Sequence, residues 1–270
     1  MEDTQGANDK PVSPPPVFKF LEFKGVRFKY PGTDNYILKG ISFKMESGRH
    51  YAFVGLNGAG KTTITKLLTG LYDEFEGDIL INDKNISEYG QGELKSFFSV
   101  VYQDFARYHI TMKDNIRIGG INAMESEDEA ERIKQAVERV GLQETVKKLP
   151  DGIDTPLGKI KGGGMDVSGG EWQRIAMARA VMNPAPVRIL DEPTAALDPI
   201  SESRLYEEYE QISRDKTTIF ISHRLGSTKL ADEILVIGDG HIIENGTHDE
   251  LMDLDGVYTQ MYESQRSWYQ

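Results

Sequence analysis

The chain has no cysteine among its 270 residues, so it can form neither a disulfide framework nor a thiolate metal site. No uninterrupted apolar run reaches the roughly 18 residues that a membrane-spanning helix requires. The first residues, MEDTQGANDK, lack the basic and then apolar pattern of a secretory signal. We therefore expect a chain that is itself soluble and that works in a reducing compartment.

Basic residues are few relative to acidic ones. The chain has 31 Lys and Arg against 43 Asp and Glu, which gives a net charge of -12. A protein this acidic repels phosphate backbones instead of collecting them, so we expect no nucleic acid among its partners. The hydrophobic content of 39% is enough to bury one full core, which excludes a disordered or fibrous chain.

The pattern of apolar residues indicates an α/β chain. Residues 1–17 are polar and rich in proline, which predicts a flexible lead-in, and we expect the folded domain over residues 18–270. Alternating apolar runs within residues 18–45 predict antiparallel strands. Helical spacing within about residues 91–182 predicts an inserted helical subdomain. Short apolar runs such as VRIL and TTIFIS then alternate with helical segments, as in a mostly parallel sheet.

The strongest chemical signal is the run GLNGAGKT, which fits the phosphate-loop pattern GxxxxGK[ST] between a predicted strand and a predicted helix. Glycines let consecutive backbone N–H groups face one anion, and the helix adds its positive N-terminal end. Lys61 can then reach the β- and γ-phosphates, and the Thr62 hydroxyl can ligate Mg²⁺. The predicted nucleotide-binding residues of this loop are Gly55, Asn57, Gly58, Ala59, Gly60, Lys61, Thr62 and Thr63.

Two acidic residues, Asp191 and Glu192, follow the apolar run VRIL. A parallel strand ends at the carboxyl edge of the sheet, so both residues are expected beside the phosphate loop. There Asp191 can hold the hydration shell of Mg²⁺, binding the metal through water. Glu192 can orient or deprotonate the water that attacks the γ-phosphate. Together with the phosphate loop, this pair predicts a hydrolase acting on a nucleoside triphosphate.

A third motif, VSGGEWQR, opens another predicted helix. The Ser168 hydroxyl and the exposed backbone of Gly169 and Gly170 form a second place for an anion at a helix start. With this motif the chain resembles the ATP-binding-cassette (ABC) ATPases, from Phe18 to the C-terminus. The resemblance implies a P-loop core with a mostly parallel sheet, an antiparallel β subdomain and an inserted α-helical subdomain.

The resemblance also implies the cofactors, ATP and Mg²⁺, and a head-to-tail homodimer. In such a dimer the signature of one subunit closes on the ATP of the other, so that two identical sites form across a two-fold axis. The signature residues expected to contact the opposite subunit's ATP are Ser168, Gly169, Gly170 and Glu171.

Four further residues match the family in type and order. Tyr30 resembles the aromatic residue that stacks on adenine, and Gln103 resembles the glutamine that touches Mg²⁺. Asp198 resembles the aspartate that crosses the dimer interface, and His223 resembles the histidine that contacts the γ-phosphate. The resemblance therefore implies two sets of site residues. The catalytic set is Glu192, His223 and Lys61, and the metal set is Thr62, Gln103 and Asp191.

The chain departs from the family pattern in two places. Arg188 stands in the strand before Asp191 where an apolar residue is usual, so either its side chain has a partner or the local packing differs. Lys159 follows Gly158 where export-type members usually have glutamate, and a glycine-rich loop comes next. Neither departure removes the predicted magnesium site.

The overall resemblance is to the ATPase domain of an exporter, and it is greatest to exporters of modified peptides or antibiotics. Such exporters tend to have Gln-Asp-Phe after the strand and a tryptophan within the signature helix. In this chain the corresponding residues are Gln103-Asp104-Phe105 and Trp172. A transmembrane domain, in the same chain or in a partner chain, would then place this domain at the cytoplasmic face of the cell membrane. This sequence does not identify the transported substrate, because the residues that contact the substrate would lie in membrane helices.

Two alternatives remain open. One is the ATPase subunit of an ABC uptake system, and the other is a soluble ABC ATPase acting on nucleic acid or ribosomes. Soluble relatives usually carry long coiled-coil insertions or two cassettes in one chain. The modest helical subdomain and the acidic charge of this chain favour the exporter.

Overall fold

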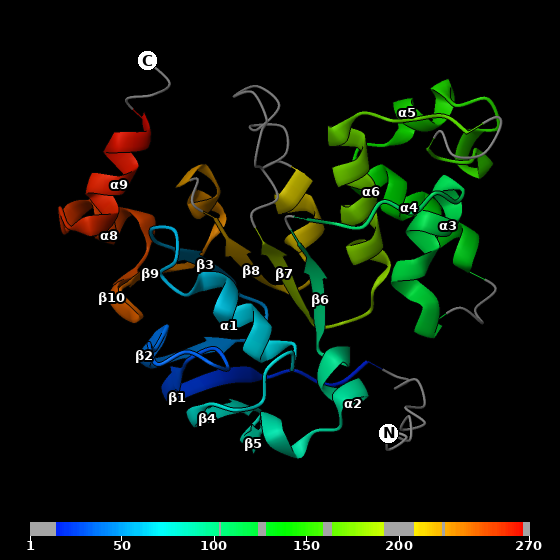
Figure 1. Cartoon of the computed structure of the whole chain (residues 1–270). Helices are drawn as coiled ribbons and strands as arrows, with labels where there is room; N and C mark the ends of the chain where they lie inside the picture. The colour runs from blue at the N-terminus through cyan, green and yellow to red at the C-terminus, as the bar shows by residue number, and fades with distance from the viewer. Residues whose placement is uncertain are drawn as a thin grey trace.

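A computed structural model describes residues 15–102, 104–123, 128–158, 164–191, 208–222 and 225–266. Five residues singled out by the sequence lie outside the described residues: Gln103, Lys159, Glu192, Asp198 and His223. Most of the lead-in over residues 1–17 also lies outside them. The described part contains an antiparallel sheet, a larger mixed sheet and a group of helices beside it (Figure 1).

The antiparallel sheet has four strands in the order β2-β1-β4-β5. Their bounds are β1 Phe20–Phe28, β2 Leu38–Glu46, β4 Glu76–Ile81 and β5 Lys84–Asn85. Strand β1 pairs with β2 and β4 in antiparallel register, which confirms the prediction from the alternating apolar runs. Asn82 and Asp83 have φ of 52° and 67°, the left-handed conformation of a tight hairpin turn between β4 and β5.

The larger sheet has six strands in the order β10-β9-β3-β8-β7-β6, and only β10 runs antiparallel to its neighbour. The strands β3, β7 and β8 are buried along nearly their whole length, as expected for parallel strands covered on both faces. This confirms the predicted mostly parallel sheet. The strands are β3 His50–Val54, β6 Phe98–Val101, β7 Val187–Asp191, β8 Thr217–Ile221, β9 Glu233–Gly238 and β10 His241–Gly246.

The helices follow apolar spacing in the sequence. In α4, for example, Ile133, Ala136 and Val137 are buried, as predicted from their helical spacing. Among the described residues, no helix combines the length and the apolarity needed to cross a bilayer. The helices are α1 Lys61–Leu68, α2 Gln91–Ser96, α3 Met112–Arg117, α4 Glu129–Arg139, α5 Gln143–Lys148, α6 Gly169–Met182, α8 His248–Asp253 and α9 Val257–Arg266; 3-10 turns span Ile86–Glu88, Ile118–Ala123, Gly152–Asp154 and Leu225–Leu230.

The region expected to form the helical subdomain, about residues 91–182, contains α2, α3, α4, α5 and α6. It also contains β6, which pairs with β7 in the six-stranded sheet. The bounds of the subdomain therefore stay a prediction. Helix α6 packs mainly against α3, α4 and β6, so it joins the helices to the sheet.

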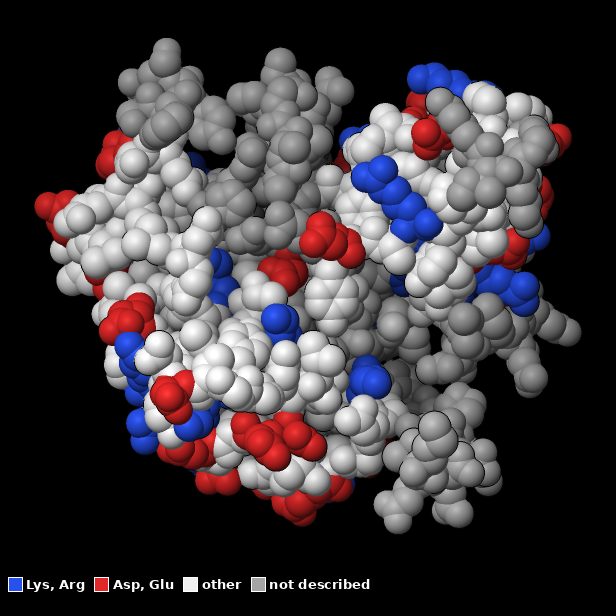
Figure 2. All heavy atoms as spheres, viewed as in Figure 1, with Lys and Arg blue, Asp and Glu red and all other residues white. Residues whose placement is uncertain are grey.

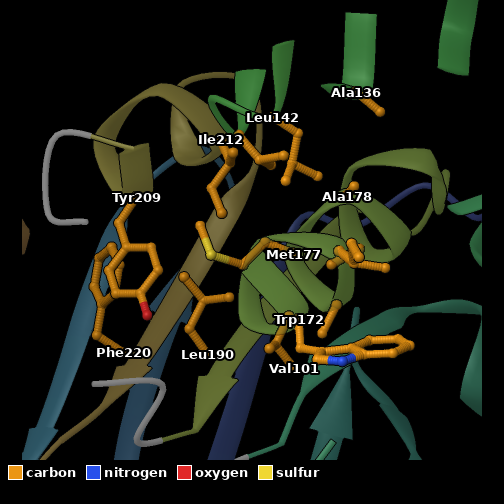
Figure 3. Packing of buried hydrophobic residues seen from close by; sticks show 14 of the residues in the cluster. Val101, Ala136, Leu142, Trp172, Met177, Ala178, Leu190, Tyr209, Ile212 and Phe220 are labelled. Atoms are coloured by element: carbon orange, nitrogen blue, oxygen red, sulfur yellow. The ribbon is translucent and has the colours of Figure 1, made fainter. Parts of the chain in front are cut away.

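The core between α6 and the sheet is apolar and closely packed. Figure 3 shows Met177 of α6 pointing toward Ile212 and toward Leu190 of β7. Tyr209 lies against Phe220 of β8, with 6.3 Å between the ring centroids. These contacts fix α6 relative to the strand that ends in Asp191.

Arg188, the first departure from the family pattern, has partners inside the protein. Its side chain is only 2% exposed in the middle of β7. The guanidinium donates to the carbonyl oxygen of Ala180 in α6 at 3.0 Å, and to that of Ile212. Burial lowers the pKa of Arg188 to about 10. The arginine therefore fastens two flanking helical segments to β7, instead of leaving a charge without hydrogen bonds.

Candidate functional site

The phosphate loop leaves the sheet directly after β3. Gly55 has a φ of 149°, and a Cβ atom placed there would overlap the carbonyl oxygen of Ile237 in β9. Only glycine fits such a close approach of two backbones. The loop therefore begins at a position that the neighbouring strand determines.

Helix α1 begins directly after the phosphate loop. Its N-cap is Gly60, no side chain caps it, and its first turn carries no acidic residue. In contrast, Ser168 and Thr247 cap α6 and α8 with complete capping boxes. The N–H groups and the positive dipole end of α1 are thus available to an anion.

Lys61 lies over this loop. Its ammonium donates to the carbonyl oxygens of Gly55 at 2.7 Å and Leu56 at 3.2 Å, and the residue is only 5% exposed. The buried cation faces the space enclosed by the loop, as the chemistry of a phosphate site requires. Thr62, the next residue, is exposed at the start of α1.

Asp191 ends β7 at the carboxyl edge of the sheet and is 5% exposed. It pairs with Ile221 of β8, and Ile221 pairs with Phe53 of β3. Since neighbouring strands lie about 4.8 Å apart, Asp191 is about 10 Å across the sheet from Phe53. Phe53 comes two residues before Gly55, so the structure places Asp191 level with the beginning of the phosphate loop.

Tyr30 lies beside α1, in the segment after β1. Its hydroxyl is 3.0 Å from the Oγ1 of Thr63, and Lys66 Nζ is 3.3 Å from the same hydroxyl. The Tyr72 ring packs edge to face against the Tyr30 ring, with 5.4 Å between the ring centroids. Both tyrosines line a surface groove of about 930 Å³, large enough to admit a flat base. Tyr30 is thus linked directly to the helix that follows the phosphate loop.

The geometry around Tyr30 gives a prediction for two variants. Tyr30→Ala removes the ring and is expected to weaken ATP binding by roughly 1–3 kcal/mol, the usual value of a base-to-aromatic stack. Tyr30→Phe keeps the ring and loses only the hydroxyl contacts with Thr63 and Lys66, so we expect a cost of about 0.5–1.5 kcal/mol. Titration of each variant with ATP measures both values. Equal losses would mean that the hydroxyl, and not the ring, carries the contact.

The signature motif forms the start of α6. Ser168 Oγ accepts a hydrogen bond from the backbone N–H of Glu171 at 3.2 Å, and Glu171 Oε2 accepts from the N–H of Ser168 at 2.7 Å. This capping box confirms that Ser168 serves as an N-cap. Ser168 Oγ accepts from the backbone of Glu171, and the Ser168 hydroxyl also interacts with the Glu171 carboxylate, so Glu171 contacts both the backbone and the side chain of Ser168.

Two contacts of α6 were not predicted from the sequence. Arg179 donates from Nε to the carbonyl oxygen of Asn115 at 2.9 Å and from Nη1 to that of Ala106 at 2.6 Å. It thereby ties α6 to the loop that follows Gln103. Arg174 and Glu208 form a two-pronged ion pair at 2.9–3.1 Å, which holds α6 to the helical residues near Tyr209. The only signal for Arg179 was a basic residue within the apolar run IAMARAVM.

The described site residues fall into two groups. The phosphate loop, Asp191 and Tyr30 lie together around α1 and the carboxyl ends of β3 and β7. The signature residues lie apart from them, at the start of α6 among the other helices (Figure 1). Within one chain, the two groups do not meet.

A glycine-rich loop after a parallel strand, a buried lysine over that loop and an aspartate ending a nearby strand define a P-loop nucleotide hydrolase. The ABC transporter family profile matches residues 38–195, more than half of the chain. The chain belongs to the ABC transporter family, and it is an ATP-binding domain and an ATPase of that family.

Its relatives include a named transport protein and a named flippase. The chain is 40% identical over 264 residues to the subtilin transport ATP-binding protein SpaT of Bacillus subtilis, covering 98% of this chain and 42% of that protein. It is 37% identical over 245 residues to the ATP-dependent lipid A-core flippase of Escherichia coli K12, covering 91% of this chain and 41% of the flippase. The resemblance to peptide and antibiotic exporters is thereby confirmed at the level of an exporter-type domain.

A solved structure of a bacterial Atm1-family ABC exporter with ATP bound has a similar fold. The TM-score is 0.81 at 34% identity, covering 94% of this chain and 44% of that chain. The chain therefore spans about two fifths of the length of the proteins it matches.

Proposed function

We propose that this domain binds ATP with Mg²⁺ and hydrolyses it at the interface of a head-to-tail homodimer, driving export by a transmembrane domain. In this proposal, residues 18–270 form the ATPase unit and residues 1–17 the lead-in. The domain works at the cytoplasmic face of the membrane.

The main support for the shared site comes from the open surroundings of Gly169 and Gly170. A Cβ atom placed at either residue would meet nothing within 4 Å, and neither has a positive φ. Glycine costs roughly 0.5–1 kcal/mol relative to alanine in a helix, and no neighbour among the described residues requires it here. Two bare backbone positions on an open surface are instead suited to the close approach of another molecule.

The separation of the two groups of residues supports a second copy of this chain as that molecule. One nucleotide held by the phosphate loop of a chain does not reach the signature of the same chain, because the two lie apart (Figure 1). In a two-fold dimer, each signature faces the nucleotide of its partner. Ser168 and the two glycines would then donate to the γ-phosphate held by Lys61 of the opposite subunit, with Glu171 beside them and Asp198 at the interface.

The residues present suit Mg²⁺. Thr62 offers an exposed hydroxyl oxygen at the start of α1, and Asp191 offers a carboxylate at the nearby sheet edge. Mg²⁺ prefers such oxygen ligands, keeps several waters and bridges to substrate phosphates. We propose Thr62 and Gln103 as ligands and Asp191 as a ligand through water. When bound, the ion would neutralise charge on the β- and γ-phosphates.

Hydrolysis then depends on the chain's own groups. Lys61 holds the phosphates, Glu192 orients the attacking water and accepts its proton, and His223 contacts the γ-phosphate. These roles for Glu192 and His223 rest on their positions after β7 and β8 in the sequence.

A membrane partner is supported by the relatives. The proteins named as exporters and flippases extend far beyond the region they share with this chain. A nucleic-acid partner is disfavoured by the net charge of -12. On the face drawn in Figure 2, Lys and Arg side chains are scattered among acidic ones and form no continuous band.

The dimer proposal is tested by the mass of the protein in solution. Each subunit carries a net charge of -12, so subunits without a shared nucleotide should repel each other at low salt. We expect a monomer without nucleotide and with ADP, and a dimer of Glu192→Gln with ATP and Mg²⁺, by light scattering. Wild-type activity per molecule should rise with protein concentration until dimer formation saturates. Constant activity per molecule, with no dimer of Glu192→Gln in ATP, would rule out the shared site for this domain.

A further inference from the structure

The signature of this chain is held in place by a residue outside the motif. Thr145 lies in α5 and is only 8% exposed. Its hydroxyl donates to Oε1 of Glu171 at 2.8 Å. The other oxygen of the same carboxylate, Oε2, accepts the backbone N–H of Ser168 at 2.7 Å. A continuous set of hydrogen bonds therefore runs from α5 through Glu171 to the first residue of the signature.

The electrostatics of Glu171 favour this arrangement. Burial on its own raises the pKa of Glu171, but the hydrogen bonds from Ser168 and Thr145, with Lys148 nearby, outweigh it and lower the pKa below its ordinary value. The carboxylate thus stays ionised at neutral pH. An ionised carboxylate accepts stronger hydrogen bonds than a neutral group, so both bonds restrict its rotation.

Glu171 in turn fixes the side chain of Ser168. The backbone N–H of Glu171 donates to Ser168 Oγ at 3.2 Å, while its carboxylate holds the Ser168 backbone. Ser168 is exposed, and the hydrogen bonds described for its side chain are those with Glu171. The direction of the hydroxyl therefore depends on Glu171, and the rotamer of Glu171 depends on Thr145.

We infer that Thr145 is a positioning residue for the signature: through Glu171 it holds Ser168 in the orientation that binds the γ-phosphate of the opposite subunit. This inference rests on the proposed shared site. It goes beyond that proposal, because it assigns a role to α5, a helix outside the proposed nucleotide-binding residues. A displacement of α5 relative to α6 would, by the same contacts, loosen the signature.

The test uses variants that differ by single atoms. Thr145→Val has the same shape but lacks the hydroxyl, and Thr145→Ser restores it. Thr155→Val is the matched control, because Thr155 is also buried in this region, at 1% exposure, and its hydroxyl accepts from the backbone N–H of Asp151. The hydrogen bond of its hydroxyl is thus made with the backbone of Asp151 and not with the Glu171 carboxylate. The two valine variants should lose similar thermal stability, and only Thr145→Val should affect the signature.

The decisive measurement is the ATPase activity of two mixtures. In a dimer of Thr145→Val with Lys61→Ala, the productive site joins the phosphate loop of the first with the intact signature of the second. In a dimer of Thr145→Val with Ser168→Arg, the productive site must use the signature of Thr145→Val. We expect the second site to be about tenfold less active than the first, since losing a hydrogen bond to a charged group changes an equilibrium by at least about that factor. Thr145→Ser and Thr155→Val should show no difference between their two mixtures.

The outcomes separate the inference from the function on which it rests. If a mixture of Lys61→Ala with Ser168→Arg regains no activity, the shared site itself is wrong. If that mixture regains activity but Thr145→Val behaves alike in both of its mixtures, Thr145 does not position the signature. A loss of ATP binding by the Thr145→Val monomer would also overturn the inference, because a defect in the signature leaves the phosphate loop intact.

Discussion

Glu192→Gln is expected to bind ATP like the wild type and to hydrolyse it roughly 10²–10⁴-fold more slowly. Glutamine keeps the shape and the hydrogen-bonding reach of glutamate but cannot accept a proton from the attacking water. The loss should therefore appear in kcat and leave ATP binding nearly unchanged. Measuring equilibrium ATP binding and steady-state hydrolysis on the same preparation separates the two effects.

Lys61→Ala is expected to differ from Glu192→Gln in its effect on ATP binding. Its ammonium lies over the phosphate loop, bonded to the carbonyl oxygens of Gly55 and Leu56, so its removal should weaken ATP binding itself. A Glu192→Gln protein that still hydrolyses ATP at the wild-type rate would exclude Glu192 as the residue that activates water. A change in binding alone would give it a structural role beside Asp191.

Much of the fold follows from local patterns in the sequence. Alternating apolar residues predicted the antiparallel strands β1 and β2, and short, mostly apolar runs predicted the buried strands β7 and β8. Both patterns reflect which faces of a strand are covered. The order of the strands in the larger sheet does not follow from such patterns. Strand β3 lies between β8 and β9, which are far from it in the sequence. No local pattern encodes that pairing.

The residues of the candidate site also include some that the sequence predicts and some that it does not. Residues whose chemistry is tied to a fixed spacing, such as Lys61 and Asp191, were predicted, and the structure places them along one edge of the sheet. Their roles remain predictions. Thr145 and Arg179 act through contacts with residues 26 and 64 positions away, to Glu171 and Asn115. The first contact exists only after α6 has packed against α5, and the second only after α6 has packed against α3, so no spacing in the sequence predicts either of them.

Arg188 shows why an unusual residue is hard to interpret from the sequence. A charge inside an apolar strand suggested either a partner or altered packing. The partners are the backbone carbonyls of Ala180 and Ile212, which every residue type provides. A search of the sequence for an acidic partner would have failed, because the charge is solvated by the backbone.

The second prediction of large effect concerns two variants that are each inactive. Lys61→Ala lacks the lysine of the phosphate loop, and Ser168→Arg places a long side chain on the open surface beside Gly169 and Gly170. In a homodimer of either variant, both sites carry the defect, so we expect no measurable turnover. In a heterodimer, one site joins the intact phosphate loop of Ser168→Arg with the intact signature of Lys61→Ala.

Random pairing in an equal mixture makes half of the dimers heterodimers, each with one working site of two. If the sites act independently, activity should return to about one quarter of the wild-type value. Varying the ratio of the two variants at a constant total protein concentration should give a maximum near equal amounts. A mixture as inactive as its components, although Glu192→Gln dimerises in ATP, would mean that Lys61 and Ser168 do not serve the same nucleotide. Recovery can occur only if the two residues act on one ATP from different chains, because neither variant contains a complete site of its own.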